Sequence, residues 1–325
     1  MEVQSKLPFL HTVIGGIGIL GNAVVCVVIV KVPVMRTLTN AFIFNQAFVD
    51  LLGSLVMALQ SNIPAPTELN QSAVIAAIQC YIWRANLILW VLFFASTLNL
   101  VMLTAERYVA IAHPLKYLTY FGKKQATIML AAVWAFAIAF KATDALYYRI
   151  SDHTCMFTSL SPAASFSWGT ISFLVEYLLP LIFMTSCYVH IIYQLKKASS
   201  TVHAEPTSSQ NNSNSLSGSL VRARRNTLLT LFIVFITYTI CWSPNQIAFL
   251  MFHFGFKIDF NGTFYFVSLV LVQLNCCINP IIYAFKYKQF QAGVRVLLTQ
   301  CCPRIAPRRR EVELVPTVSQ GLHPF

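Results

Sequence analysis

Seven long runs of apolar residues constrain this chain more than any other feature. Each is long enough to cross a bilayer, for which an α-helix needs roughly 20 predominantly apolar residues. Acidic or basic residues are rare within them: Asp50 in the second, Lys141 and Asp144 near the end of the fourth, and Glu176 in the fifth. The runs cover residues 7–30, 39–62, 85–105, 125–148, 166–193, 226–256 and 260–285. The chain is therefore predicted to cross a membrane seven times.

The composition favours a membrane protein over a soluble one. Only 10% of the 325 residues are charged and the mean hydropathy is +0.64, whereas a soluble domain carries about 25% charged residues. The runs are predicted to be helices, because lipid offers no partners to unpaired backbone groups and the alternation typical of membrane β-strands is missing. We expect an all-α membrane protein, a seven-transmembrane helix bundle.

Lys and Arg indicate the orientation, because cytoplasmic loops carry an excess of both. With the N-terminus outside, 18 of the 23 Lys and Arg residues fall on the cytoplasmic side. The other five are Lys6, Arg84, Lys141, Arg149 and Lys257. A membrane surface thus accounts for the net charge of +12, and no nucleic-acid partner is expected. The start of the chain shows no cleavable signal pattern, so the first run is expected to direct insertion.

Each run also carries a short motif, and the motifs follow one another along the chain. They are residues 21–25 with Asn22, residues 45–51 with Asp50, Glu106-Arg107-Tyr108 followed by Pro114, Trp134, Pro180 with Tyr188, Cys241-Trp242-Ser243-Pro244, and Asn279-Pro280-Ile281-Ile282-Tyr283, after which Phe290 lies in an amphipathic stretch. Together they make residues 10–300 resemble a rhodopsin-like (class A) G-protein-coupled receptor. The resemblance is strongest to peptide-type receptors and loosely to the somatostatin and galanin receptors.

The resemblance implies a domain organisation and a set of partners. It implies a short extracellular N-terminus (1–7), a receptor domain with a short amphipathic eighth helix (8–298), a flexible cytoplasmic loop (198–220) and a cytoplasmic tail (299–325). It implies a plasma-membrane protein without enzymatic activity, and an extracellular ligand that activates a heterotrimeric G protein through movement of helix six. Arrestin and receptor kinases are implied as further partners, with kinase sites at Ser199, Ser200, Thr201 and Ser208.

Two groups of residues are implied to form the switch. The arginine of the Glu-Arg-Tyr motif pairs with its acidic neighbour in inactive members of the family and meets the G protein in active ones. The G-protein switch is expected at Glu106, Arg107, Tyr108, Tyr188, Asn279, Pro280 and Tyr283, and a ligand-sensing toggle at Trp242, Tyr238 and Pro244. Each proline removes a helical hydrogen bond and creates a kink. Trp134 is interpreted as plain helix packing.

Asp50 lies mid-membrane, where a charge costs at least a few kcal/mol. The family pattern implies a sodium site at Asp50, Ser96, Asn275 and Asn279, and no other cofactor. Asn22 falls at a matching depth. The alternative is a protonated structural acid that is hydrogen-bonded to its neighbours.

Cysteines and glycosylation triplets suggest covalent modifications. Cys80 and Cys155 lie on the extracellular side, where disulfides persist, and should tie the top of helix three to the following extracellular loop. Cys80 stands two residues further from Arg107 than is usual in the family. A bulge in helix three would absorb the two extra residues, and so would a position of Cys80 in the loop before that helix. Palmitoylation is expected at Cys301 and Cys302, with free thiols as the alternative. Asn70 and Asn261 are candidate glycosylation sites.

The ligand is less constrained than the fold. Leu89 stands where amine receptors carry Asp, and Gln273 stands where opsins carry the retinal lysine. The predicted ligand pocket comprises Asn86, Leu89, Trp90, Asp144, Glu176, Asn245, Gln246 and Gln273. Glu176 needs a partner, which is either a basic group of the ligand or an internal one such as His253 or Lys141. The mixed polar pocket favours a peptide; the alternative is a non-amine small molecule or a lipid.

Three further hypotheses concern signalling without ligand and the class of protein. Some relatives carry an acid near Arg224 that locks Arg107; a basic residue there predicts measurable signalling without ligand. A transporter or channel is the remote alternative, but Asp50 and Glu176 are too sparse to line a path. A membrane enzyme finds no support, because no metal-binding cluster or Ser–His pair lies at one depth.

Overall fold

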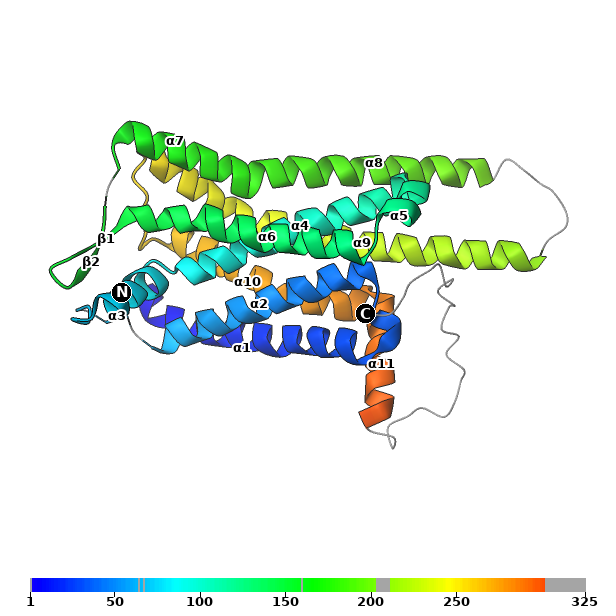
Figure 1. The fold of residues 1–325 in the computed structure, drawn as a ribbon, viewed down its shortest axis with the longest axis horizontal. Coiled ribbons are helices and arrows are strands. Elements are labelled where there is room, and N and C mark those ends of the chain that lie inside the picture. The colour runs from blue at the N-terminus through cyan, green and yellow to red at the C-terminus, as the bar shows by residue number, and fades with distance from the viewer. Residues whose placement is uncertain (1, 64, 67, 159, 203–210, 302–325) are drawn as a thin grey trace.

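The computed structural model describes residues 2–63, 65–66, 68–158, 160–202 and 211–301. Its helices run side by side along the long axis of the molecule (Figure 1). Within the described residues, seven helices or consecutive helical segments are long and apolar enough to cross a membrane. They are Phe9–Lys31, Leu38–Asn62, Leu87–Ala112, Lys123–Tyr147, Pro162–Gln194, Asn226–His253 and Thr263–Lys286. The predicted seven-helix bundle is thereby confirmed.

The secondary structure is almost entirely helical. Its α-helices are α1 (Glu2–Lys31), α2 (Leu38–Asn62), α3 (Ala73–Ala77), α4 (Leu87–Ala112), α5 (Pro114–Tyr120), α6 (Lys123–Ala142), α7 (Pro162–Phe173), α8 (Leu179–Val202), α9 (Asn211–His253), α10 (Thr263–Lys286) and α11 (Lys288–Cys301). Shorter elements are the 3₁₀ helices η1 (Pro33–Met35) and η3 (Thr143–Tyr147), the π-helices η2 (Ile78–Arg84) and η4 (Leu174–Leu178), and the strands β1 (Tyr148–Ser151) and β2 (Thr154–Phe157).

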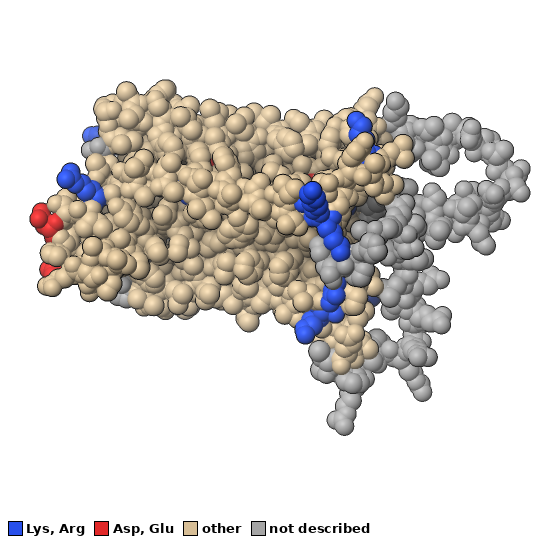
Figure 2. All heavy atoms as spheres, in the orientation of Figure 1, with Lys and Arg blue, Asp and Glu red and all other residues tan. Residues whose placement is uncertain are grey.

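The surface matches the orientation predicted from charge. In Figure 2 the Lys and Arg side chains gather towards the end of the bundle where α5 and α11 lie, and the broad middle of this face is nearly free of charged atoms. Large apolar side chains such as Leu20, Val189 and Ile240 are exposed along the spans. Such a belt suits lipid contact and would be unusual on a soluble protein.

The spacing of Cys80 is absorbed before the third span begins. Cys80 lies in the π-helical segment η2, and α4 starts only at Leu87, after Asn86 adopts a left-handed conformation with φ 55°. Asn tolerates this conformation better than most residues. Cys80 is bonded to Cys155 in the β1–β2 hairpin, with 5.3 Å between the Cα atoms. The predicted disulfide is confirmed. The two extra residues between Cys80 and Arg107 are accommodated by the π-helical turn of η2 and by the start of α4 at Leu87, after Cys80.

The cytoplasmic end differs from expectation in one respect. The loop predicted at 198–220 is helical at both ends, since α8 continues to Val202 and α9 begins at Asn211; residues 203–210 lie outside the described residues. Extending an existing helix avoids the cost of nucleation, which explains why polar Ser and Asn residues continue it. The predicted eighth helix is present as α11, which lies across the bundle end (Figure 1), and its Phe290 is buried.

Candidate functional site

A buried charge cluster lies near the extracellular end of α6. The Lys141 ammonium contacts Glu176 Oε1 at 2.7 Å and Asp144 Oδ2 at 3.2 Å. Glu176 comes from η4, the π-helical turn of the fifth span. The partner of Glu176 is therefore an internal lysine rather than His253, whose Nδ1 instead lies 2.9 Å from Ser165 Oγ. The cluster thus brings two carboxyl groups and one ammonium group together.

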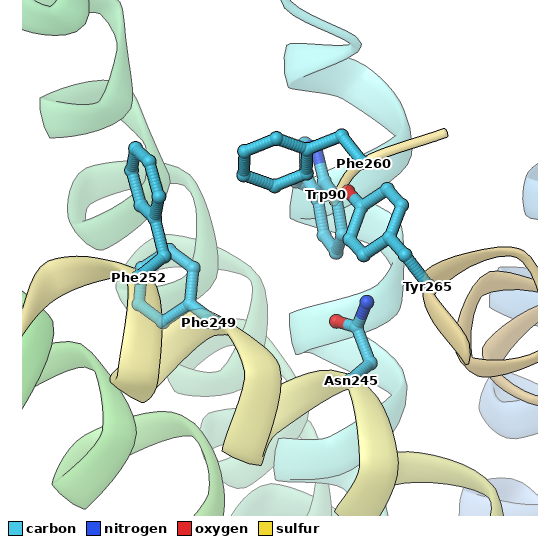
Figure 3. Close-up of a pocket in the computed structure, with 6 residues that line it drawn as sticks. All are labelled: Trp90, Asn245, Phe249, Phe252, Phe260 and Tyr265. Carbon is cyan, nitrogen blue, oxygen red and sulfur yellow. The ribbon is translucent and has the colours of Figure 1, made fainter. Parts of the chain in front are cut away.

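A small aromatic cavity adjoins this cluster. Its volume is about 70 Å³, and its lining is Trp90, Asn245, Phe249, Phe252, Phe260 and Tyr265. Aromatic rings from α4, α9, α10 and the α9–α10 loop surround the space, and the Asn245 amide points into it (Figure 3). The Lys141 ammonium lies 5.7 Å from the centre of the Trp90 ring, a cation–π distance. Trp90 thus belongs to both the cavity and the charge cluster.

Only part of the predicted ligand pocket comes together at this cavity. Trp90 and Asn245 line it, whereas Asp144 and Glu176 belong to the charge cluster. Asn86 forms the left-handed residue that starts α4. Leu89, Gln246 and Gln273 are buried within the bundle.

The four other aromatic residues of the cavity were not predicted from the sequence. Phe249 and Phe252 follow Asn245 at helical spacing, so a shared helix face would have indicated them. Phe260 and Tyr265 come from the loop after α9 and the start of α10. Their position cannot be read from periodicity.

The predicted toggle is packed beneath the charge cluster. Trp242 makes edge contacts with Phe93 at 5.8 Å between ring centres and a tilted contact with Tyr238 at 6.2 Å. The Tyr238 hydroxyl donates to the backbone carbonyl of Glu176 at 3.3 Å. A hydroxyl at position 238 therefore links α9 to the π-helical turn that carries Glu176, and Pro244 lies within α9 just above.

Asp50 of α2 is 1% exposed and is surrounded by hydrogen-bond donors. Ser96 donates to Oδ1 at 3.1 Å and the Asn279 amide donates to Oδ2 at 2.9 Å. The Gln46 amide nitrogen lies 3.3 and 3.2 Å from the two carboxylate oxygens and makes a short hydrogen bond to Ser96. Asn275 is buried one turn before Asn279. Asp50, Ser96 and Asn279 thus meet as predicted, and Gln46 joins them.

Gln46 is the innermost member of a chain of polar side chains that crosses the bundle. The Trp134 indole donates to Asn45 at 3.1 Å, Asn45 donates to Asn99 at 2.9 Å, and Asn99 donates to the Gln46 carbonyl at 2.8 Å. Trp134 is therefore more than packing. The position of Gln46 one turn before Asp50 was the signal in the sequence, because residues four apart share a helix face.

The donors around Asp50 do not fit a sodium ion as the family pattern places it. A hard cation needs oxygen lone pairs directed at it, and here an N–H group lies among the oxygens of Asp50 and Ser96. Asn22, also expected at this depth, donates to the backbone carbonyls of Gly18 and Cys276.

The cytoplasmic switch residues form a closed cluster around Glu106. Glu106 is completely buried and makes a short ion pair with Arg107. It also accepts hydrogen bonds from Thr39 at 3.2 Å and from the Tyr117 hydroxyl at 2.6 Å. Burial and the Glu106 carboxylate raise the pKa of Tyr117, so its hydroxyl remains a donor at physiological pH. This pairing corresponds to the inactive arrangement that the family resemblance implies.

The remaining switch residues make contacts of their own. The Tyr108 hydroxyl lies 2.9 Å from His190 Nδ1, and Tyr188 packs against aromatic rings of α9. Tyr283 is buried, and its hydroxyl has no hydrogen-bond partner among the described residues. A rotation of Tyr283 would thus break no hydrogen bond within the described part of the chain. The side chain of Arg224 is not described.

The predicted glycosylation sites are accessible. Asn70 and Asn261 are both exposed, as glycosylation requires. Cys301 ends α11 and Cys302 lies outside the described residues, so palmitoylation stays a prediction.

Comparison with known proteins agrees with this geometry. The family model described as 7 transmembrane receptor (rhodopsin family) matches residues 21–283. This chain belongs to that family. The chain is therefore a multi-pass receptor of the plasma membrane and not an enzyme. Within the described residues, no group of three or more His, Cys, Asp or Glu side chains is placed to hold a metal ion.

Several curated relatives resemble the receptor over most of its length. The neuromedin-U receptor 2 of Rattus norvegicus is 27% identical, over 90% of this chain and 75% of the relative. The allatostatin-A receptor of Bombyx mori is 25% identical, over 93% and 81%. The somatostatin receptor type 4 of Rattus norvegicus is 27% identical, over 88% and 71%.

Proposed function

We propose that this receptor binds an extracellular peptide and activates a heterotrimeric G protein. The relatives are named for neuromedin-U, allatostatin-A and somatostatin, all of which are peptides. Leu89 is apolar and 9% exposed, so the position that binds amines in other receptors offers no carboxylate here. The charge cluster and the aromatic cavity at the extracellular end supply a different recognition surface.

The charge cluster favours a basic group on the ligand. Two carboxyl groups share the single ammonium group of Lys141, so a basic group of the ligand would find a carboxyl partner in the cluster. Asp144 is the more accessible partner, with its side chain 25% exposed against 9% for Glu176. A lysine, arginine or terminal amine of the peptide would pair with Asp144 while Lys141 stays with Glu176. The surplus carboxylate is the observation that carries the proposal.

The aromatic cavity suits one side chain of such a peptide. Pockets for whole small ligands measure about 300–1,000 Å³, several times the 70 Å³ found here. We expect the peptide to lie across the extracellular mouth and to insert one apolar or aromatic residue between Phe249, Phe252 and Tyr265. The Asn245 amide at the base of the cavity would bind a polar atom of that residue or of its backbone.

The route to the cytoplasm runs through the fifth and sixth spans. A ligand that pulls on Asp144 or Lys141 changes the environment of Glu176, whose backbone carbonyl is bonded to Tyr238. Tyr238 contacts Trp242, which lies two residues before Pro244 in α9. Movement of the α9 cytoplasmic end would then open the cluster around Glu106 and release Arg107 to the G protein. Arrestin and receptor kinases complete the proposed partners.

The test is a peptide-library screen in cells that express the full chain, read out by arrestin recruitment. Active peptides are expected to contain a basic residue close to an aromatic or large apolar one. Asp144→Asn should reduce their potency about tenfold or more, the equivalent of about 1.4 kcal/mol. Asp152→Asn, in the exposed turn of the β1–β2 hairpin, is the matched control and should leave potency unchanged.

Two results would contradict the proposal. Activation by neutral lipids or small molecules, with no active peptide, would favour the alternative ligand class. Equal potency of basic peptides on the receptor and on Asp144→Asn would remove the charge cluster from recognition.

A further inference from the structure

We infer that the side-chain amide of Gln46 takes the place of the sodium ion beside Asp50, so that this receptor is insensitive to sodium. The inference does not depend on the peptide ligand proposed above. It rests on three observations: the direction of the Gln46 amide, the number of donors on Asp50, and the oxygens that remain.

The direction of the Gln46 amide is fixed from the far end of its hydrogen-bonded chain. An indole N–H can only donate, so Trp134 requires the oxygen of Asn45 to face it. The nitrogen of Asn45 must then donate to the oxygen of Asn99, and the nitrogen of Asn99 to the oxygen of Gln46.

Each of these amides accepts one hydrogen bond with its oxygen, which leaves its nitrogen to donate the next one. The nitrogen of Gln46 therefore faces Asp50. Turning it round would bring its oxygen against a carboxylate and its N–H groups against those of Asn99, whose remaining acceptor is the Phe42 backbone carbonyl at 3.0 Å.

The carboxylate of Asp50 is enclosed by neutral donors on both oxygens. A carboxylate offers about four lone-pair sites on its two oxygens. Oδ1 receives Gln46 at 3.3 Å and Ser96 at 3.1 Å, and Oδ2 receives Gln46 at 3.2 Å and Asn279 at 2.9 Å. Three neutral donor groups thus face the two oxygens, and the Gln46 amide is shared between both of them and Ser96.

The oxygens that would hold a cation are directed elsewhere. The Ser96 hydroxyl donates to Asp50 and accepts from Gln46, so the Gln46 nitrogen lies against the Asp50 and Ser96 oxygens at once. The Asn279 nitrogen faces Asp50, which turns its oxygen away from the carboxylate. A sodium ion at this place would meet the positive ends of N–H bonds, which repel it.

The test compares thermal unfolding of the purified full-length receptor in NaCl, KCl and choline chloride at equal ionic strength near 0.15 M, about the physiological value. A ligand that binds only the folded state raises the melting temperature in a concentration-dependent way. The receptor should melt at the same temperature in all three salts. Gln46→Leu and Gln46→Ala, which remove the amide donor, should each gain a saturable rise specific to sodium.

Adding Asp50→Asn to the Gln46→Ala receptor controls for the site. The sodium-specific rise should disappear, because the carboxylate that attracts the ion is lost. Sodium-specific stabilisation of the unaltered receptor would overturn the inference, whatever the variants do. Folded Gln46 variants that melt alike in sodium and potassium would equally overturn the claim that the amide excludes the ion.

Discussion

Two buried carboxylates in the spans of this receptor are neutralised in opposite ways. Glu176, near the extracellular end, faces the ammonium group of Lys141 at 2.7 Å. Asp50, deeper in the bundle, receives only neutral donors, from Gln46, Ser96 and Asn279. Both side chains are buried, so neither charge is compensated by water.

The difference bears on what each site can do. A buried ion pair is strong only while both partners are present, and losing one costs about 3–5 kcal/mol. A ligand that draws one partner away therefore imposes a large free-energy cost on Glu176 unless it replaces that partner. The donors around Asp50 are oriented by a chain of fixed amides, each worth about 0.5–1.5 kcal/mol net. That arrangement resists rearrangement and suits a rigid core around which the spans move.

The largest expected effect tests the charge-paired side of this comparison. Lys141→Met should leave Glu176 buried without a cation and destabilise the receptor by about 3–5 kcal/mol. The double variant Lys141→Met with Glu176→Gln should recover much of that loss, because no unpaired buried charge remains. Melting temperature and surface expression measure both. Lys257→Met, on the same side but exposed, should have little effect; equal losses at positions 141 and 257 would contradict the pairing.

A smaller loss of stability is expected when the hydrogen-bonded series of Trp134, Asn45, Asn99 and Gln46 is interrupted at Asn99. Asn99→Leu removes the donor to Gln46 and the acceptor of Asn45, and each buried polar group left unpaired costs about 1–3 kcal/mol. The same measurement of melting temperature applies. Asn62→Leu, at an exposed amide on α2, serves as the control. If Asn99→Leu lowers the melting temperature no more than Asn62→Leu does, the hydrogen-bonded series of Trp134, Asn45, Asn99 and Gln46 contributes nothing to stability.

A third carboxylate, Glu106, combines both modes of neutralisation. Tyr117→Phe removes one hydroxyl donor but leaves the pair with Arg107, and a hydrogen bond to a charged group is worth about 1.5–3 kcal/mol. Signalling without ligand should rise several-fold, measured as second-messenger output scaled to surface expression. Tyr120→Phe, 70% exposed on the same short helix, should not change it.

The same assay tests the basal activity predicted from Arg224. Arg107→Ala defines zero, and an unaltered receptor that signals no more than this variant would refute that prediction.

The sequence predicted the fold well because hydropathy and charge act on whole helices. The spans, their orientation and the Cys80–Cys155 pair could all be predicted from residue types and positions along the chain. Single motif residues such as Asp50 and Trp242 were also located, because each belongs to a run whose depth in the membrane is known.

The partners of those residues were harder to predict. The cavity residues Phe260 and Tyr265 depend on how a loop folds back, and the choice of Lys141 over His253 for Glu176 depends on a π-helical turn in the fifth span. Gln46 was overlooked although it shares a helix face with Asp50. Tertiary packing decides each of these, and no local periodicity reports it.

The smallest expected effect tests the outer end of the amide chain. Trp134→Phe keeps an aromatic ring at this position but removes the indole N–H that donates to Asn45. Asn45 therefore loses one hydrogen bond, at 3.1 Å. A neutral hydrogen bond is worth about 0.5–1.5 kcal/mol, and a small drop in melting temperature is expected. Trp168→Phe is the matched control, because the described residues show only ring contacts for that indole. If Trp134 sets the direction of the chain, Trp134→Phe should also loosen the orientation of Gln46 and let sodium stabilise the receptor weakly. A drop in melting temperature without any response to sodium would confine the role of Trp134 to packing and one local hydrogen bond.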